Sequence, residues 1–412
     1  MKNSCVKWIG EIPDDWSVMS VKHFFNIERG RVISVFELCD DGEFPVYSSQ
    51  TENNGCFGYL KTYDYSGPAI TWTTDGAKAG AVFYREGKYN CTNVCGILTF
   101  KNDNEKTCNI KFMTYAIGMV AEQNKRKDIN GYKIMSNEMA KIKFAVPPLL
   151  VQKAIATFLD KKCSEIDGLY SDIEKQIDVL EEYKKSIITE AVTKGLNPDV
   201  EMKDSGIEWI SMIPKHYEIK PLKYLVDYNA SSLPENTTPY YEFDYIDISS
   251  VTYGKGIEQF QRMCFKDAPS RARRIVHKND VILSTVRTYL KATAEIPENE
   301  LPIIVSTGFI TLTANALIDP QYLKYIVQLD AFVSEVESRS TGVSYPAINA
   351  SEVVKIKIIL PPPNEQREVA NYLNNKCSEI DAVIEDEKAK LETLTEYKKS
   401  LIYEYVTGKK EV

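Results

Sequence analysis

A stretch of 44 residues occurs twice in this chain, and the repeat constrains the fold more than any other feature. The first copy covers residues 152–195 and the second covers residues 366–409, with 20 identities and no gap. The runs KCSEID and EYKKS are shared by both copies. Apolar residues recur three and four positions apart, which is the spacing of one helix face. The repeat therefore predicts two long helices, each spanning roughly 65 Å if unbroken.

Each predicted helix has one apolar stripe, and such a stripe needs a partner helix. We expect the two copies to pair in an antiparallel, coiled-coil-like arrangement with pseudo-twofold symmetry. Only Glu387 interrupts the stripe with a charge. The predicted seam positions are Ile166, Leu169, Ile173, Ile177, Leu180, Tyr183 and Ile187 in the first copy, and Ile380, Val383, Glu387, Leu391, Leu394, Tyr397 and Leu401 in the second. Cys163 and Cys377 hold equivalent places and are predicted to be buried small side chains at this seam.

A second repeated marker, W-I-x-x-I-P, begins at Trp8 and at Trp209. The segment between marker and helix differs between the two halves, so the chain is a tandem duplication with divergent middles. Strand-like runs separated by turn residues fill both middles, at residues 17–146 and 218–360. One helix is predicted in each, over residues 109–121 and 320–333.

The fold class predicted from these patterns is α+β, with two mixed, mostly β globular domains and two long helices between them. The predicted boundaries are residues 1–148 for the first globular domain, 149–196 for the first helix, 197–362 for a linker and the second globular domain, and 363–412 for the second helix. Proline pairs before each helix, beginning at Pro147 and Pro361, suit the change from strand to helix.

Composition excludes several classes of protein. No run of eighteen or more apolar residues is present, which argues against a membrane span, and nine cysteines without a secretory leader predict a cytoplasmic protein. Motifs for a phosphate-binding loop, a serine hydrolase, a zinc protease and an amino-methyltransferase are missing. Cys91 and Cys95 lack a second ligand pair, so we predict no metal site. The chain is therefore predicted to be non-catalytic.

The total net charge of −8 argues against nucleic-acid binding. Basic residues are nevertheless clustered in parts of the sequence. Residues 262–291 hold eight Lys or Arg against two Asp. Polar loops at residues 338–345 and 124–132, and a turn around Lys78, offer further side chains for phosphates or bases. The predicted DNA-contacting residues are Thr73, Thr74, Lys78, Lys125, Arg126, Lys127 and Tyr132 in the first domain, and Arg271, Arg273, Arg274, Arg287, Tyr289, Lys291, Arg339, Ser340, Thr341 and Tyr345 in the second.

Together, the duplicated marker, the P-P-x-x-x-Q stretch, and the helices with KCSEID and EYKKS resemble the specificity subunit of a type I restriction–modification system. In the second domain, residues 279–288, 306–309 and 340–342 are similar to target-recognition domains of that family. The first-domain counterparts, residues 68–80 and 124–132, match loosely.

This resemblance implies that each globular domain reads one half of a bipartite, asymmetric DNA site. It implies that the helices set the spacing and dock two methylation subunits, through which restriction and translocation subunits join. S-adenosylmethionine, ATP and Mg²⁺ would be bound by those partners, and this chain would bind no cofactor. Three alternatives stay open: a DNA-reading subunit of another methylation or restriction system, a protein-binding scaffold, and an enzyme.

Overall fold

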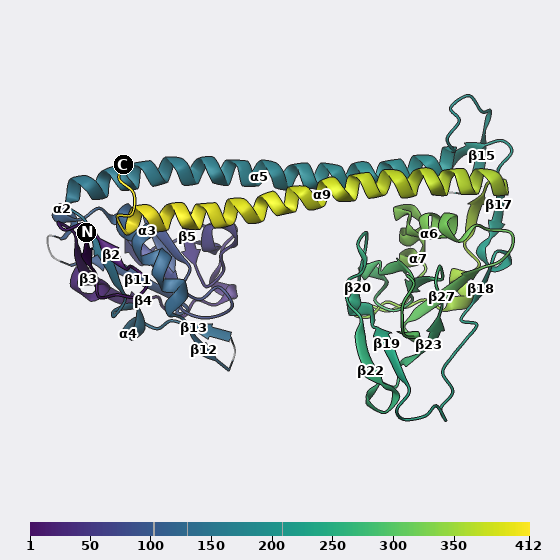
Figure 1. Cartoon of the computed structure of the whole chain (residues 1–412), viewed down its shortest axis with the longest axis horizontal. Helices are drawn as coiled ribbons and strands as arrows, with labels where there is room; N and C mark the ends of the chain where they lie inside the picture. Colours follow the sequence, from purple (N-terminus) through teal and green to yellow (C-terminus); the bar gives the residue numbers. More distant parts are fainter. Residues whose placement is uncertain (102–103, 130, 208) are drawn as a thin grey trace. The chain divides into compact units, whose positions relative to one another are not determined.

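The computed structural model describes residues 1–101, 104–129, 131–207 and 209–412. These residues form two compact units, which are Met1–Glu174 with Lys388–Val412 (unit 1) and Lys175–Glu387 (unit 2). Two long helices, α5 (Leu149–Lys194) and α9 (Pro363–Val406), each contribute residues to both units (Figure 1). The predicted α+β class with a tandem repeat is confirmed. None of the described helices is both long and apolar enough to cross a membrane.

Unit 1 is built around two four-stranded sheets. The first has the order β4 (Phe25–Arg29), β11 (Cys95–Phe100), β8 (Ala69–Thr73) and β9 (Val82–Arg85). The second has the order β6 (Cys56–Leu60), β5 (Phe44–Tyr47), β10 (Lys88–Cys91) and β7 (Tyr65–Ser66), with a parallel pairing of β5 and β10. Shorter pairs join β1 (Lys2–Asn3) to β2 (Glu11–Ile12), and β3 (Ser17–Ser20) to β14 (Lys143–Val146). The helices are α1 (Val21–Phe24), α2 (Asn104–Thr107), α3 (Ile110–Ala121) and α4 (Ser136–Met139).

Unit 2 repeats this topology with different residues. Its first sheet has the order β18 (Val226–Tyr228), β27 (Phe309–Ala314), β24 (Val281–Ser284) and β25 (Thr293–Glu295). Its second has the order β22 (Gln261–Cys264), β19 (Glu242–Ile246), β26 (Ile303–Ser306) and β23 (Ala272–Val276), again with one parallel pairing, of β19 and β26. Shorter pairs are β15 (Met202–Ile207) with β16 (Ile210–Pro214), β17 (Glu218–Pro221) with β28 (Lys357–Leu360), and β20 (Val251–Thr252) with β21 (Gly256–Ile257).

The helix predicted over residues 109–121 is α3, whereas the one predicted over residues 320–333 is two helices. These are α6 (Pro320–Gln328) and α7 (Asp330–Ser338), and a four-residue helix α8 (Ala350–Val353) follows later. The chain turns at Leu329, whose ψ of 133° is not helical. The hydroxyl of Tyr253 donates to the Asp330 carboxylate and also lies 3.2 Å from the Gln328 carbonyl, so it contacts the residues on both sides of the break.

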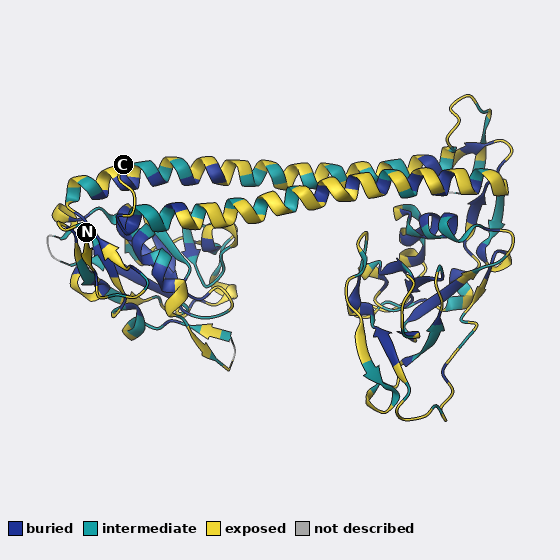
Figure 2. Cartoon of the chain, in the orientation of Figure 1, coloured by how far each residue is buried: buried dark blue, intermediate teal, exposed yellow. Residues whose placement is uncertain are grey.

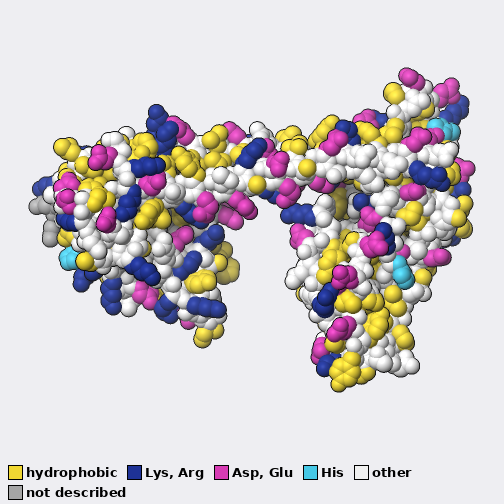
Figure 3. All heavy atoms as spheres, in the orientation of Figure 1, with side chains coloured by type: hydrophobic (Ala, Val, Ile, Leu, Met, Phe, Trp, Pro, Cys, Tyr) yellow, Lys and Arg dark blue, Asp and Glu magenta, His cyan; other side chains and the backbone are white. Residues whose placement is uncertain are grey.

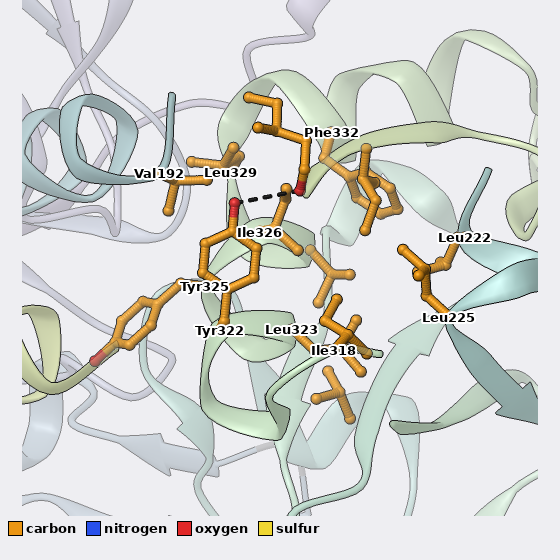
Figure 4. Packing of buried hydrophobic residues seen from close by; sticks show 14 of the residues in the cluster. Val192, Leu222, Leu225, Ile318, Tyr322, Leu323, Tyr325, Ile326, Leu329 and Phe332 are labelled. Atoms are coloured by element: carbon orange, nitrogen blue, oxygen red, sulfur yellow. Dashed lines mark hydrogen bonds between the residues drawn. The ribbon is translucent and has the colours of Figure 1, made fainter. Parts of the chain in front are cut away.

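A buried core lies beneath α6 and α7 in unit 2. Tyr322 and Ile326 lie among aliphatic side chains there, and Phe332 and Val192 belong to the same cluster (Figure 4). The Tyr322 hydroxyl donates to the Ile359 carbonyl at 3.2 Å, which satisfies the polar atom that burial would otherwise penalise. Unit 1 has its own core, which includes Trp72, Phe112 and Phe144, and buried residues likewise occupy the interior of each globular part (Figure 2).

One glutamine anchors the start of each long helix to its globular domain. In unit 1, Gln152 Nε2 donates to the Pro147 carbonyl and its Oε1 accepts from the Asn109 N–H, both at 2.8 Å. In unit 2, Gln366 donates to Pro361 at 2.8 Å and accepts from the Asp319 N–H at 2.7 Å. Asn109 and Asp319 are themselves the N-caps of α3 and α6. The repeated P-P-x-x-x-Q stretch therefore has a structural role, which we call the glutamine clamp.

The W-I-x-x-I-P marker receives the end of the helix from the other repeat. In unit 1, a Cβ on Gly408, after α9, would lie 2.5 Å from Cδ of Pro13 in the marker. In unit 2, a Cβ on Gly195, after α5, would lie 4.0 Å from Cγ of Pro214 in the marker and 2.5 Å from the hydroxyl of Tyr217, three residues beyond it. Both glycines have positive φ, as is typical of the residue that ends a helix. Close backbone approach and the left-handed conformation both favour glycine here.

At four positions, the residue that faces the helix seam is not the one predicted. Ile166 and Ile380 are buried, and Ile173, Ile177, Leu180, Leu391 and Leu394 are half-buried. The seam prediction was wrong for Leu169, Tyr183, Val383 and Tyr397, which are 55%, 56%, 45% and 55% exposed. The stripe instead includes the next residue in each case, for example the buried Ile384 in place of Val383. One residue is a rotation of about 100° on a helix, which is enough to leave the seam.

Polar pairs also lie on this seam, and the same pair occurs in both units. Lys398 Nζ contacts Asp167 Oδ1 at 2.5 Å in unit 1, and Lys184 Nζ contacts Asp381 Oδ1 at 2.6 Å in unit 2. Cys163 and Cys377 are buried at equivalent places beside Tyr115 and Tyr325, and burial raises the pKa of both thiols.

Candidate nucleic-acid interface

In unit 1, the turn between β8 and β9 (residues 74–81) lies against the hairpin of β12 (Arg126–Asp128) and β13 (Gly131–Lys133). The Gly76 N–H donates to the Tyr132 carbonyl at 3.0 Å, and the Ile134 N–H donates to the Thr74 carbonyl at 2.9 Å. Two backbone bonds thus join segments that lie more than fifty residues apart in the sequence, and they bring two predicted DNA-contacting loops together.

Unit 2 joins the equivalent segments in the same way. The turn between β24 and β25 (residues 285–292) lies against a loop after α7 (residues 339–347). The Arg287 N–H donates to the Pro346 carbonyl at 2.8 Å, and the Ile348 N–H donates to the Thr285 carbonyl at 2.9 Å. Thr341 and Ala347 also exchange two backbone bonds of 2.9 Å, which close the loop. Both units therefore present one turn and one loop from a shared backbone frame.

Two of the residues predicted in unit 1 are not available for contact. Thr73 and Thr74 are 1% and 0% exposed, and their hydroxyls donate to the Lys78 carbonyl and to Asp75 Oδ2. The predicted direct contact of these two side chains with DNA is wrong in this structure, because a β-strand end places them inward. Lys78 projects from the same turn and is exposed.

The other predicted residues of unit 1 lie on the hairpin or beside it. Arg126 and Lys127 are exposed, and Arg126 Nε contacts Glu138 Oε1 at 2.8 Å. Lys125 is half-buried, with its Nζ 4.8 Å from the centre of the Tyr132 ring. Asn130, within the predicted loop at residues 124–132, lies outside the described residues. Lys and Arg side chains gather over the part of unit 1 that carries this hairpin (Figure 3).

Acidic residues neutralise part of this basic surface and leave the rest available. Lys133 pairs with Asp128 at 2.8 Å, and this hydrogen bond holds the pKa of Asp128 below its usual range. Lys133 also lies 3.6 Å from Asp75. In the part of the chain that the structure describes, Lys78 and Lys127 form no ion pair, so both remain free to contact a phosphate.

The predicted DNA-contacting residues of unit 2 lie in two places, on the second sheet and on the turn and loop. Arg271 and Arg273 belong to the second sheet and its edge, where Arg271 contacts Asp247 at 2.5 Å and Arg273 stacks on Phe265 at 5.1 Å. The turn and loop carry the rest. Tyr289 and Tyr345 are 49% and 67% exposed there. Thr341 is also exposed, and Arg339, two residues before it, contacts Glu335 at 2.5 Å.

Three further predicted residues of unit 2 lie on the turn and the loop. Ser340 donates to the Val336 carbonyl and accepts from Thr288, each at 2.8 Å, so its hydroxyl holds the loop against the turn. The Lys291 Nζ lies 5.8 Å from the centre of the Tyr253 ring. Arg287 has its guanidinium 5.2 Å from the centre of the Tyr345 ring.

A polar cavity of about 470 Å³ opens beside this loop. Arg274, Arg339 and Thr341 line it, which brings together predicted residues from β23 and from the loop. The Arg274 Nε is buried without a hydrogen-bond partner among the described residues. Such a donor can serve an acceptor group of a ligand.

Sequence reasoning missed several residues at these surfaces. Asn229 and Asn349 line the cavity, although more than a hundred residues separate them, and no local pattern connects the two. Ile129 and Val343 stand at the tips of the hairpin and the loop with exposures of 98% and 101%. Ile129 and Val343 are each an aliphatic residue inside a polar loop, and this pattern in the sequence could have identified them.

Comparison with known proteins places the chain in a family. The model for the type I restriction modification DNA specificity domain matches residues 13–178 and 214–393. The MjaVIII type I restriction enzyme specificity subunit of Methanocaldococcus jannaschii is 27% identical over 423 aligned positions, covering 97% of this chain and 93% of that protein. The MpnII specificity subunit of Mycoplasma pneumoniae is 34% identical, covering 45% of this chain and 57% of that protein.

A solved chain from a study of complex assembly and conformational transition in the type I restriction–modification system shares the fold. Its TM-score is 0.67 with 13% sequence identity, and the match covers 96% of this chain and 98% of that one. Because the family model matches twice and spans most of the sequence, the chain belongs to the type I restriction–modification DNA specificity family, as a non-catalytic specificity subunit that acts on DNA together with other subunits of such a system.

Proposed function

We propose that each unit reads one half of a bipartite, asymmetric double-stranded DNA site. The observation that carries this proposal is the pair of turn-and-loop surfaces, which share backbone bonds but differ in side chains. Unit 1 offers Lys78 and Lys127, whereas unit 2 offers Arg287 and Lys291. Different side chains on one frame recognise different base edges, so the two half-sites should differ in sequence.

The two long helices set the separation of the half-sites and dock two methylation subunits in this proposal. Exposed apolar residues at equivalent positions of the repeat support it, namely Leu169 with Val383 and Tyr183 with Tyr397. Two like surfaces suit two copies of one partner. Restriction and translocation subunits would join through these methylation subunits, and the partners would bind S-adenosylmethionine, ATP and Mg²⁺.

Duplex binding at several salt concentrations tests the reading function. The purified chain, alone and with its methylation subunits, should bind duplexes that carry the target more tightly than duplexes that do not. Its affinity should fall steeply with salt, because phosphate contacts release counterions. A protein scaffold would bind no duplex even at low salt, and methyl transfer by the chain alone would establish an enzyme; either result would refute the proposal.

Paired insertions test the spacing function. Seven residues added after Lys175 in α5 and after Ala389 in α9 lie at equivalent points of the repeat and preserve the heptad. They lengthen each helix by about 10 Å, so methylation mapping should show a spacer longer by about three base pairs. Insertion into α5 alone is the matched control, which should impair assembly because the pairing loses register. An unchanged spacer with the paired insertions would contradict the spacing role.

A further inference from the structure

The turns at residues 74–81 and 285–292, which we call the recognition turns, are closed alike but have different residues at two positions of positive φ. Thr73 N–H bonds to the Ala81 carbonyl at 3.0 Å, and Ser284 N–H bonds to the Ala292 carbonyl at 2.8 Å, so the turns begin and end alike. Gly76 and Gly80 have φ of +97° and +90° in unit 1. At the matching places in unit 2, Arg287 and Lys291 have φ of 52° and 51°.

Left-handed backbone is readily adopted by glycine and costs conformational energy for other residues. Unit 1 shows that glycine is compatible with this turn at both positions. Strained positions of this kind cluster where a side chain is needed for function. Two long cationic side chains therefore stand at strained positions of the unit 2 turn, where glycine would fit with less strain.

Arg287 is the better placed of the two to read a base. Its backbone N–H is fixed by the Pro346 carbonyl at 2.8 Å, and its guanidinium stacks 5.2 Å from the centre of the Tyr345 ring. Arg271 and Arg339 each contact a carboxylate, but Arg287 has no ion pair within the described residues. Its planar set of N–H donors is therefore exposed, oriented and unoccupied.

From this geometry we propose that Arg287 reads a guanine through the major groove in the half-site bound by unit 2. A guanidinium matches the O6 and N7 acceptors of guanine with two parallel hydrogen bonds, and Tyr345 holds the guanidinium plane. Lys291, on the same turn, would contact a phosphate and set the register. This inference rests on the proposed function, in which unit 2 binds duplex DNA.

The variant Arg287→Gly tests the role of the side chain without disturbing the turn, because unit 1 has glycine there. The assembled complex of chain and methylation subunits should remain folded, with thermal stability equal to or above that of the unsubstituted protein. Affinity for the target duplex should fall about 10-fold to 100-fold. Methylation mapping should then show one guanine position of that half-site becoming degenerate.

The matched control is Lys291→Gly, which relieves the same strain on the same turn. It should weaken binding to all duplexes alike and reduce the slope of log affinity against log salt by about one. The recognised sequence should not change. Relaxed sequence recognition in Lys291→Gly and not in Arg287→Gly would overturn the assignment.

Base analogues identify the contacted atoms. Replacing each guanine of the half-site in turn with 7-deazaguanine removes N7, and one position should lose affinity in the unsubstituted complex but not in Arg287→Gly. Hypoxanthine, which lacks only the minor-groove amino group, should have no such effect. If the complex binds its target but Arg287→Gly recognises the same sequence, the guanine contact is wrong while DNA reading stands. If the complex binds no target duplex, the proposed function itself fails.

Discussion

The glutamine clamps of the two units share the same two hydrogen bonds, whereas the two recognition turns carry different side chains at matched positions of positive φ. Gln152 and Gln366 each accept from the N-cap residue of a helix and donate to a proline carbonyl. The turns share their closing hydrogen bond and their bonds to the neighbouring loop, yet glycines in one correspond to Arg287 and Lys291 in the other. Buried polar groups need fixed partners, so the clamp cannot vary freely, but exposed positions of the turn can.

The largest expected effect comes from exchanging one recognition surface completely. Replacing residues 17–146 with the corresponding segment of a related subunit should change one half of the target and leave the other half unchanged. The surfaces are separate in each unit, so neither should depend on the other. Methylation mapping of DNA exposed to the assembled complex measures the result, and changes in both halves would disprove independent reading.

Removing a clamp should have a strong but local effect on stability. Gln152→Leu would leave the Asn109 N–H and the Pro147 carbonyl buried without partners, at a cost of about 1–3 kcal/mol for each group. Hydrogen exchange should show less protection of α3, with α6 unaffected, and Gln366→Leu should show the reverse. Equal loss of protection in both helices after either substitution would mean that the clamps do not act unit by unit.

A fall in pH should reduce the stability of unit 2 more than that of unit 1, by a smaller amount than the loss of a clamp. Asp244 on β19 is buried, and a hydrogen bond from Arg262 holds the pKa of its carboxyl below the ordinary value. A carboxyl with a depressed folded pKa stabilises the fold above its unfolded pKa, and this stability is lost as the pH falls through the folded pKa. The corresponding strand of unit 1, β5, has no carboxyl side chain.

The variant Asp244→Asn isolates this contribution. It should be less stable than the unsubstituted protein at pH 7, and the difference should shrink as the pH falls below about 4. Hydrogen exchange of β19 and β5 as a function of pH measures it, with β5 as the internal control. A difference that stays constant down to about pH 2 would show that the Asp244 charge is not the cause.

The smallest effect is expected at the lysine pairs of the helix seam. Lys184→Met and Lys398→Met each remove one partly exposed ion pair, worth about 0.2–1 kcal/mol. Because Lys184 with Asp381 and Lys398 with Asp167 are equivalent pairs, the two variants should lower the melting temperature by the same small amount. Melting curves of both variants side by side would expose any asymmetry between the pairs.

Much of the fold was predictable because the repeat itself carries the information. Identical residues and a heptad spacing indicated two helices, and the strand-like runs indicated two mixed domains. Which residues face the seam was harder to predict. Leu169 and Tyr170 are both large and partly apolar, and only packing decides which of them faces inward. The break at Leu329 is contacted by Tyr253, which lies 76 residues earlier in the chain, so no local pattern could reveal this contact.

The candidate site was predictable in its segments and less so in its side chains. Both loops in each domain were identified from polar and basic residues, and the structure brings them together. Burial of Thr73 and Thr74 follows from where β8 ends, which composition does not reveal. Arg287 has left-handed backbone and donates its N–H to the Pro346 carbonyl, a partner that only the folded chain provides.

The glutamine clamp has a practical consequence for grafting recognition domains between proteins. The clamp residue belongs to the long helix, but the group it binds belongs to the N-cap of a helix inside the globular domain. A transplanted domain must therefore place a free backbone N–H at this position, which Asn109 provides in one unit and Asp319 in the other, or the glutamine of the long helix loses its donor. The junctions of such a hybrid should therefore be chosen to keep these hydrogen bonds, more than to match sequence at the junction.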